Sequence, residues 1–187
     1  MSILVILITG LIVRLISLNQ SIWLDEATTA LVSRMPLGDI FTKFMPGDFH
    51  PPLYYLVMKS WVSLFGSSEI SLRIPSVIFG VGVVYFVFMI SKKLFDKRSA
   101  LISALLASTS GLLIYYSQEA RMYMLAALLV AALFYLFIEK KWVLFATVLA
   151  FVGMTDYVAL LVVPVFLVFS GKDFKKVVKS LIPLILI

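Results

Sequence analysis

Two adjacent carboxylates, Asp25 and Glu26, directly follow the first apolar run of the chain and are its best candidates for acid–base chemistry. A carboxylate that is partly desolvated at a membrane surface can act as a general base and deprotonate an acceptor hydroxyl or amine. The structural alternative is that Asp25 caps a short helix over 27–35, with both acids near the positive end of its dipole. The residues alone give these two interpretations equal weight.

The chain has a single histidine, His50, and two prolines follow it directly. Pro51 and Pro52 suit the first turn of a helix, because an N–H at that position has no helical partner to lose. We therefore expect a fixed backbone that holds the imidazole at the entrance of a helix. A catalytic or ligand-binding role for His50 competes with a purely structural one.

A third polar stretch, 117–123, separates two strongly apolar runs. Arg121 can bind a phosphate through two parallel N–H donors, and Gln118, Glu119 and Tyr123 would then complete the site. The alternative is an ion pair between Glu119 and Arg121, which would stabilise a surface loop only slightly.

Two more arginines are candidates for binding a phosphate. Arg14 lies near the outer end of the first apolar run, and Arg73 directly precedes the next long one. Either side chain can instead extend its charged head to the membrane interface while its aliphatic part stays in lipid. Asp156, between two short apolar runs, ranks below the other polar stretches.

The composition indicates that membrane helices position these residues. Of the 187 residues, 62% are hydrophobic, whereas soluble domains are roughly half apolar. We predict an all-α fold, a polytopic transmembrane helix bundle, with residues 1–187 as a single transmembrane domain. Too few residues follow Leu181 to complete a last span, so we interpret the chain as truncated. The predicted spans are 3–18, 74–90, 100–115, 122–138, 142–154, 158–169 and one that begins at Leu181.

Charge in the loops predicts the topology. The basic loops at 92–98, 139–141 and 172–179 account for much of the net charge of +6, and this pattern is typical of cytoplasmic loops rather than of nucleic-acid binding. Residues 19–73 would form a first external loop with juxtamembrane amphipathic helices, including Leu53–Phe65 in the interface. This assignment requires that Leu53–Phe65 does not cross the membrane. All three candidate stretches then share the non-cytoplasmic face.

The sequence requires no cofactor. Cysteine is absent, which excludes disulfides, thiolate nucleophiles and cysteine-based metal sites. No two-histidine or EF-hand spacing is present. A divalent metal held by Asp25 and Glu119 remains compatible with the sequence without being required by it.

The order of the motifs resembles a known family. The chain resembles the N-terminal half of a C-type glycosyltransferase of the dolichyl-phosphate-mannose–protein mannosyltransferase superfamily (glycosyltransferase family 39). The motifs that carry the resemblance are an apolar run with Arg14, then Trp23-Leu24-Asp25-Glu26-Ala27, His50-Pro51-Pro52-Leu53-Tyr54-Tyr55, Leu64-Phe65-Gly66, Ser71-Leu72-Arg73-Ile74-Pro75 and Ser117-Gln118-Glu119-Ala120-Arg121-Met122-Tyr123.

The resemblance implies a donor sugar on a polyprenyl phosphate and an active site that opens to the outside of the cell or to the lumen. It implies that Asp25 is the catalytic base, with Glu26 beside it, and that the loop around Glu119 and Arg121 completes the donor site. Many relatives have an aspartate where this chain has Gln118-Glu119. The resemblance also implies a protein or glycolipid acceptor, in the plasma membrane or the endoplasmic reticulum.

We therefore expect a membrane glycosyltransferase, in the class of hexosyl or pentosyl transfer, that moves a sugar such as mannose. Asp25 would take the acceptor proton while Arg121, with Arg14 or Arg73, neutralises the leaving phosphate. The alternative is a truncated, non-catalytic membrane protein that binds a lipid-linked sugar or assembles with a full-length partner. A transporter fits less well, because its acids should lie within spans rather than in loops.

Overall fold

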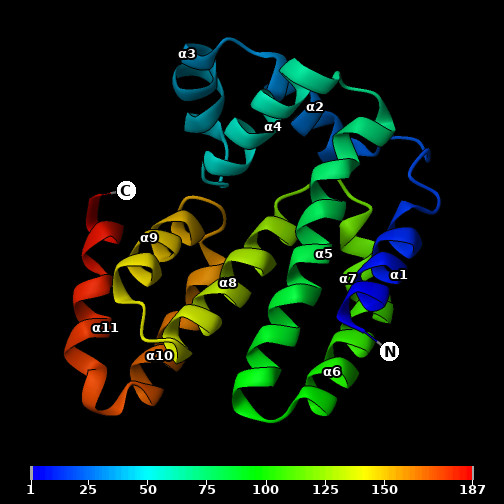
Figure 1. The fold of residues 1–187 in the computed structure, drawn as a ribbon. Helices are drawn as coiled ribbons and strands as arrows, with labels where there is room; N and C mark the ends of the chain where they lie inside the picture. The colour runs from blue at the N-terminus through cyan, green and yellow to red at the C-terminus, as the bar shows by residue number, and fades with distance from the viewer. Residues whose placement is uncertain (1, 187) are drawn as a thin grey trace.

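The computed structural model describes residues 2–186, and these residues form helices without any strand, which confirms the predicted all-α class. Short 3-10 or π segments cover Ile40–Phe44, Met45–Gly47, Val158–Val162, Gly171–Asp173 and Ile182–Leu186. The α-helices, labelled in Figure 1, are α1 (Ile3–Leu15), α2 (Leu24–Arg34), α3 (Leu37–Asp39), α4 (Leu53–Phe65), α5 (Glu69–Leu94), α6 (Lys97–Thr109), α7 (Gly111–Ser117), α8 (Tyr123–Ile138), α9 (Trp142–Gly153), α10 (Val163–Phe169) and α11 (Phe174–Ser180).

Helix α5 is the central element of the bundle. It packs against α1 and α6 on one side and against α8 on the other, and α8 in turn packs against α9. Helices α2, α3 and α4 lie together across one end of this bundle (Figure 1). The first loop therefore forms a cap on the bundle rather than another member of it.

Two apolar cores hold the bundle together. In the first, Ile6 of α1 and Val84 of α5 pack against Ala100 and Ala104 of α6. These small alanine side chains let the helix backbones approach closely, as is typical of membrane helix contacts. The second core lies among α8, α9, α10 and α11. It contains buried side chains such as Leu133, Phe145, Leu149, Phe166 and Val177.

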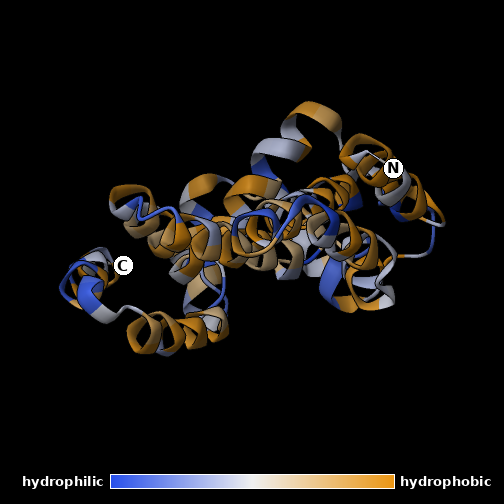
Figure 2. Cartoon of the chain, turned by 60° about the horizontal axis from the view of Figure 1, so that its bottom comes forward, coloured by the Kyte–Doolittle hydropathy of each residue, from blue (hydrophilic) through white to orange (hydrophobic). Residues whose placement is uncertain are grey.

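Apolar side chains also cover much of the outer surface. Val143 and Val168 are 82% and 77% exposed, and Figure 2 shows hydrophobic colour around most helices, with hydrophilic colour mainly in the connections. An exterior of this kind suits hydrocarbon as its solvent.

Only part of the chain meets the length expected of a simple membrane span. Within residues 2–186, α5 does so on its own, and α6 with α7 does so as a pair bent by 56°. At 26 residues, α5 is about 39 Å long, which exceeds a hydrocarbon core of about 30 Å. The other apolar helices are shorter. The number of membrane crossings predicted from the sequence therefore stays a prediction.

Several helix boundaries differ from the predicted ones. Helix α5 spans Glu69–Leu94 and so extends beyond 74–90 at both ends. Ser68 caps its start by accepting a hydrogen bond from the Ser71 amide. The predicted span 100–115 is interrupted at Ser110, whose backbone is extended. The basic stretch 172–179 is not a plain loop, since most of it belongs to α11.

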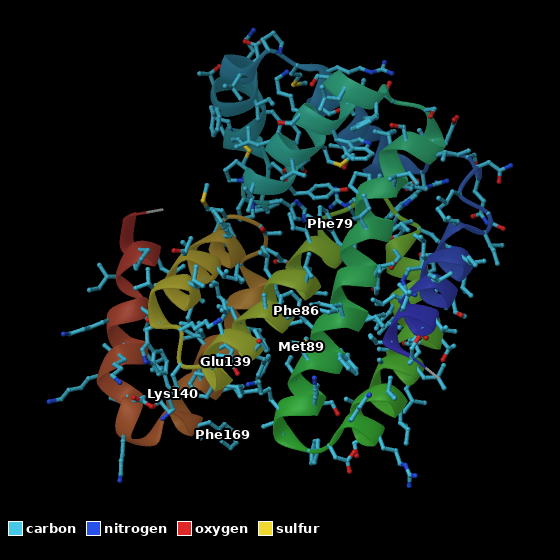
Figure 3. The ribbon with its side chains drawn as sticks, in the orientation of Figure 1. Phe79, Phe86, Met89, Glu139, Lys140 and Phe169 are labelled. Carbon is cyan, nitrogen blue, oxygen red and sulfur yellow. The ribbon has the colours of Figure 1, made fainter. Side chains whose placement is uncertain are left out.

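The polar and the basic connections lie at opposite ends of the bundle (Figures 1 and 3). At the basic end, Lys93 pairs with Glu139 at 2.6 Å, and Lys140 pairs with Asp173 at 3.1 Å. Figure 3 labels Glu139 and Lys140 there, far from the cap formed by the first loop. Which end faces the cytoplasm stays a prediction from the positive charges.

Candidate active site

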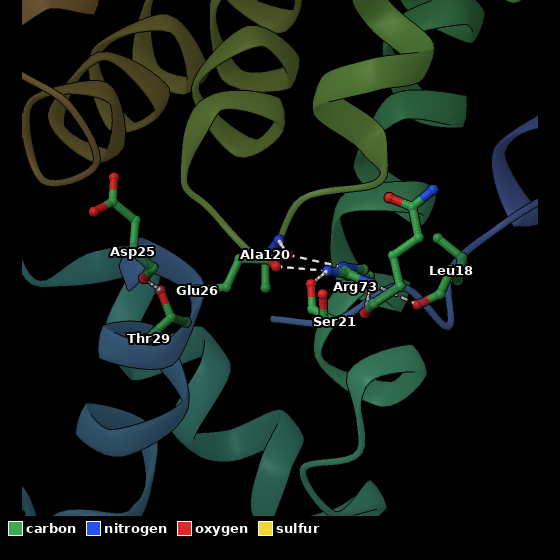
Figure 4. Close-up of polar contacts among 8 residues, drawn as sticks. Leu18, Ser21, Asp25, Glu26, Thr29, Arg73 and Ala120 are labelled. Atoms are coloured by element: carbon green, nitrogen blue, oxygen red, sulfur yellow. Dashed lines mark hydrogen bonds and ion pairs between the residues drawn. The ribbon is translucent and has the colours of Figure 1, made fainter. Parts of the chain in front are cut away.

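A buried ion pair between Glu26 and Arg73 joins three elements beneath the cap. The Arg73 Nε donates to Oε1 of Glu26 at 2.8 Å, and Nη2 donates to Oε2 at 2.6 Å. The backbone N–H of Ala120 also donates to Oε1, at 2.8 Å (Figure 4). Glu26 is only 1% exposed. Its carboxylate therefore ties α2 to α5 and to the loop between α7 and α8.

The remaining donors of Arg73 are used by the connection between α1 and α2. Nη1 donates to the carbonyls of Leu18 and Gln20 at 2.7 Å each, and Nη2 donates to that of Ser21 at 3.3 Å. A guanidinium has five N–H donors, and all five have protein acceptors here. The prediction that Arg73 binds a phosphate is therefore not supported, and we assign it a positioning role.

The side chain of Asp25 leaves α2 in a different direction from that of Glu26, which points toward Arg73 (Figure 4). Successive residues of an α-helix are rotated by about 100°, and both oxygens of Glu26 are bound by Arg73 and Ala120, so only Asp25 is free to accept a proton from a substrate. The N-cap of α2 is Trp23 and not Asp25, which contradicts the predicted capping role. The Asp25 carboxylate is instead 40% exposed and lies 3.8 Å from Nη2 of Arg121.

Arg121, in the loop between α7 and α8, is the basic group of this site. It is 5% exposed, and its Nε is buried without a hydrogen-bond partner in residues 2–186. Its guanidinium also lies 5.9 Å from the centre of the Tyr123 ring, within range of a cation–π contact. The predicted alternative, a pair with Glu119, is wrong, because the carboxylate beside Arg121 is that of Asp25.

His50 connects Arg121 to a second carboxylate. Its Nδ1 lies 2.9 Å from Oδ1 of Asp48, and its Nε2 lies 3.5 Å from Nη2 of Arg121. These neighbours assign the tautomer in which Nδ1–H donates to Asp48 and Nε2 accepts from Arg121. The two prolines precede α4 and hold this segment, with Pro52 as its N-cap.

Asp48 and Tyr55 belong to this network and were not predicted. The Tyr55 hydroxyl donates to Oδ2 of Asp48 at 2.7 Å. Burial opposes ionisation of Asp48, but the hydrogen bonds from Tyr55 and His50 outweigh it and lower the pKa of the carboxyl. The sequence signal for Asp48 was its position two residues before the only histidine.

Glu119 faces a different pocket. It lines a cavity of about 270 Å³ together with Trp23, Tyr115, Gln118 and the Glu26–Arg73 pair, whereas Asp25 and Arg121 do not line it. The Gln118 Nε2 donates to the carbonyl of Ile16 at 2.7 Å, at the end of α1. The structure thus brings Asp25, Arg121, His50 and Tyr123 together and separates Glu119 and Gln118 from them.

A sequence-family model described as dolichyl-phosphate-mannose-protein mannosyltransferase matches residues 49–187. The chain belongs to this family. No curated protein and no solved structure matches it. Membership confirms the resemblance drawn from the motifs, and it indicates membrane glycosyltransferase activity of the mannosyltransferase type. The matched range begins beside His50 and includes Arg73, Glu119 and Arg121, while Asp25 and Glu26 precede it.

In this mannosyltransferase-family chain, Arg14 is a structural residue rather than a phosphate ligand. It is 0% exposed, which also excludes extension to the interface. Its guanidinium donates to the hydroxyl of Ser117 at 3.1 Å and to the carbonyls of Gly10, Ser108 and Ala107 at 3.0, 2.9 and 3.3 Å. Ala107 and Ser108 lie at the end of α6, where the break before α7 leaves carbonyls without helical partners.

The site fits the metal hypothesis poorly. Within the described part of the chain, no group of three or more aspartate, glutamate or histidine side chains could hold a metal ion. Glu119 lines the pocket beside the Glu26–Arg73 pair, whereas Asp25 does not line it and lies beside Arg121 instead. The carboxylate of Asp25 beside the Arg121 guanidinium can instead accept a proton next to a site for an anion.

Proposed function

We propose that this chain transfers a mannose-type sugar from a polyprenyl-phosphate donor to a hydroxyl of a protein or glycolipid acceptor on the non-cytoplasmic side of the membrane. The observation that carries the proposal is the pairing of a half-exposed carboxylate, Asp25, with an arginine whose Nη2 makes one long hydrogen bond to His50, at 3.5 Å, and whose Nε has no partner in residues 2–186. Arg73 and Arg14 donate to protein oxygens, whereas Arg121 keeps donors for a ligand.

The chemistry follows from these two groups. The Asp25 carboxylate accepts the proton of the acceptor hydroxyl while that oxygen attacks the anomeric carbon of the donor sugar. The bond between this carbon and the phosphate oxygen breaks on the opposite face, and its electron pair leaves with the phosphate. Arg121 stabilises the negative charge that develops there.

The surrounding residues position this pair. The buried Glu26 carboxylate fixes α2, which carries Asp25, and binds the amide of Ala120, which directly precedes Arg121. His50 and Tyr123 contact the guanidinium from other sides. The Glu26–Arg73 ion pair therefore fixes the distance between Asp25, the base, and Arg121, the phosphate-binding group. Such fixed positioning of the reacting groups lowers the barrier to transfer.

Transfer by the purified chain in lipid nanodiscs, with a radiolabelled polyprenyl-phosphate mannose and a hydroxyl-bearing acceptor peptide, tests this proposal. We expect Asp25→Asn to lower the rate by roughly 10²–10⁴-fold, the usual effect of removing a general base. The matched control is Asp39→Asn, since Asp39 lies in the same loop and only forms an exposed pair with Lys43 at 3.0 Å.

Equal transfer by the parent and by Asp25→Asn would remove Asp25 from the mechanism. Donor binding without transfer by the parent would instead support the alternative of a non-catalytic protein that binds lipid-linked sugar. Loss of transfer in the Asp39→Asn control as well would show that any change in this loop inactivates the chain, and would contradict a specific role for Asp25.

A further inference from the structure

Glu119 and Gln118 have no part in the proposed transfer. The charges of the pocket that they line do not balance. Glu26 and Arg73 neutralise each other within it, and the Arg73 donors are all used by protein acceptors. Glu119 is 8% exposed and forms no ion pair in residues 2–186. Glu119 interacts with the Tyr115 hydroxyl, which is a neutral group, so the lining of the pocket carries one negative charge that no positive side chain balances.

We propose that this pocket binds a primary ammonium group, with Glu119 as its counter-ion. The group can be carried by a lipid headgroup such as ethanolamine or by an amino sugar. Both have the same recognition chemistry, which is one positive charge with three N–H donors.

Hydrogen bonding in the pocket favours a donor-rich ligand. The Nε2 of Gln118 donates to the carbonyl of Ile16, and the Oε1 of the same amide is available as an acceptor. Glu119 contributes two further acceptor oxygens. An ammonium matches these acceptors, whereas a phosphate or a carboxylate would add a second negative charge beside Glu119.

The walls and the size of the pocket agree with this assignment. Trp23 and Tyr115 supply aromatic surface and are 45% and 58% exposed. Aromatic rings attract cations and are typical of the headgroup level of a membrane. The volume of about 270 Å³ is below the roughly 300–1,000 Å³ of sites for drug-sized ligands. It suits one headgroup or one amino-sugar ring.

Ligand-observed NMR on the chain in phosphatidylcholine nanodiscs tests the proposal. Glucosamine is the probe, and glucose, which lacks the positive charge, is its neutral comparison. We expect glucosamine to bind at least tenfold more tightly than glucose. Glu119→Gln should abolish this preference, while Glu69→Gln should keep it, because Glu69 is an exposed glutamate outside the pocket.

A second variant and a second lipid sharpen the test. Trp23→Leu removes one ring without changing charge and should weaken glucosamine binding less than Glu119→Gln does. If phosphatidylethanolamine in the nanodisc displaces glucosamine, the headgroup is the ligand, and if it does not, an amino sugar is. Equal binding of glucosamine and glucose, or an unchanged preference in Glu119→Gln with native thermal unfolding, would overturn the proposal. Mannose transfer is measured separately, so its failure does not decide this result.

Discussion

Arg14, Arg73 and Arg121 carry the same guanidinium, but only their partners distinguish their roles. Arg73 donates to a carboxylate and three carbonyls, and Arg14 donates to carbonyls and a hydroxyl. Arg121 lies beside Asp25 and His50 with one buried donor unpaired. The sequence offered all three as phosphate ligands, because it does not show which acceptors lie near each one.

Replacing Arg121 by lysine tests its role as a two-pronged phosphate ligand. Lysine keeps the positive charge but loses the planar pair of donors, so we expect kcat/KM for mannose transfer to fall by roughly 10²-fold. The control is Arg34→Lys, because Arg34 is exposed and, within residues 2–186, its side chain bonds only the Ser67 hydroxyl. Transfer at the parental rate by Arg121→Lys would show that charge alone is sufficient.

The low pKa of Asp48 predicts a pH-dependent contribution to stability. The folded pKa lies below the ordinary value of 3.8, so the folded state favours the carboxylate. This contribution is fully present above the ordinary value and disappears as the pH falls through the folded pKa. We expect the difference in thermal stability between the parent and Asp48→Asn to be constant from about pH 5 to 7 and to shrink below about pH 4.

At the residue scale, the sequence named most of the side chains that the structure brings together around Arg121. Asp25, His50 and Arg121 were predicted and lie in contact, since each is a polar group placed in a loop between apolar runs. Asp48 was missed although it lies two residues before the only histidine, because that spacing does not show that its carboxylate contacts the imidazole. The separation of Glu119 from Arg121 follows from the backbone of the loop and cannot be derived from residue types.

At the scale of elements, local signals determined the boundaries that were predicted correctly. Helix α4 spans Leu53–Phe65 as expected, after two prolines and before Gly66, whose φ of 74° suits glycine. Helix α2 was expected over 27–35 and spans Leu24–Arg34, since Pro36 disfavours a helical residue at Met35. The break at Ser110 was missed, because the arginine that binds the freed carbonyls comes from α1, more than ninety residues away in sequence.

Removal of Arg14 should therefore act on the bend between α6 and α7. In Arg14→Leu the carbonyls of Ala107 and Ser108 lose their donor, and each buried unbonded carbonyl costs about 1–3 kcal/mol. We expect lower thermal stability in nanodiscs and reduced mannose transfer, because Ser117 at the end of α7 loses its contact as well. Arg14→Lys should recover part of both. A parental melting temperature in Arg14→Leu would show that the bend does not depend on this residue.

At the scale of the whole molecule, the two ends of the bundle differ in charge and in chemistry. The ion pairs of lysines with Glu139 and Asp173 lie at one end, and the cap with the candidate site lies at the other. The alternation of loop charges in the sequence predicted this arrangement, because each apolar helix carries the chain from one end to the other. Orientation relative to the cytoplasm depends on the positive-inside preference.

Single cysteines test this orientation without background, since the chain has none. Thr42→Cys lies on the exposed surface of the cap, and Lys97→Cys lies at the start of α6. In intact cells we expect an impermeant maleimide to label Thr42→Cys only. After permeabilisation both variants should react. Labelling of Lys97→Cys alone in intact cells would reverse the assigned orientation.

The Glu26 carboxylate has a consequence for how a bulky lipid substrate can reach the site. Moving α2 away from α5 would break the buried Glu26–Arg73 ion pair, which costs about 3–5 kcal/mol when one partner is left behind, and moving α2 away from the loop that carries Arg121 would break the hydrogen bond from the Ala120 N–H to Glu26. The isoprenoid tail must therefore reach the site by a route that leaves α2 and the loop with Arg121 in place.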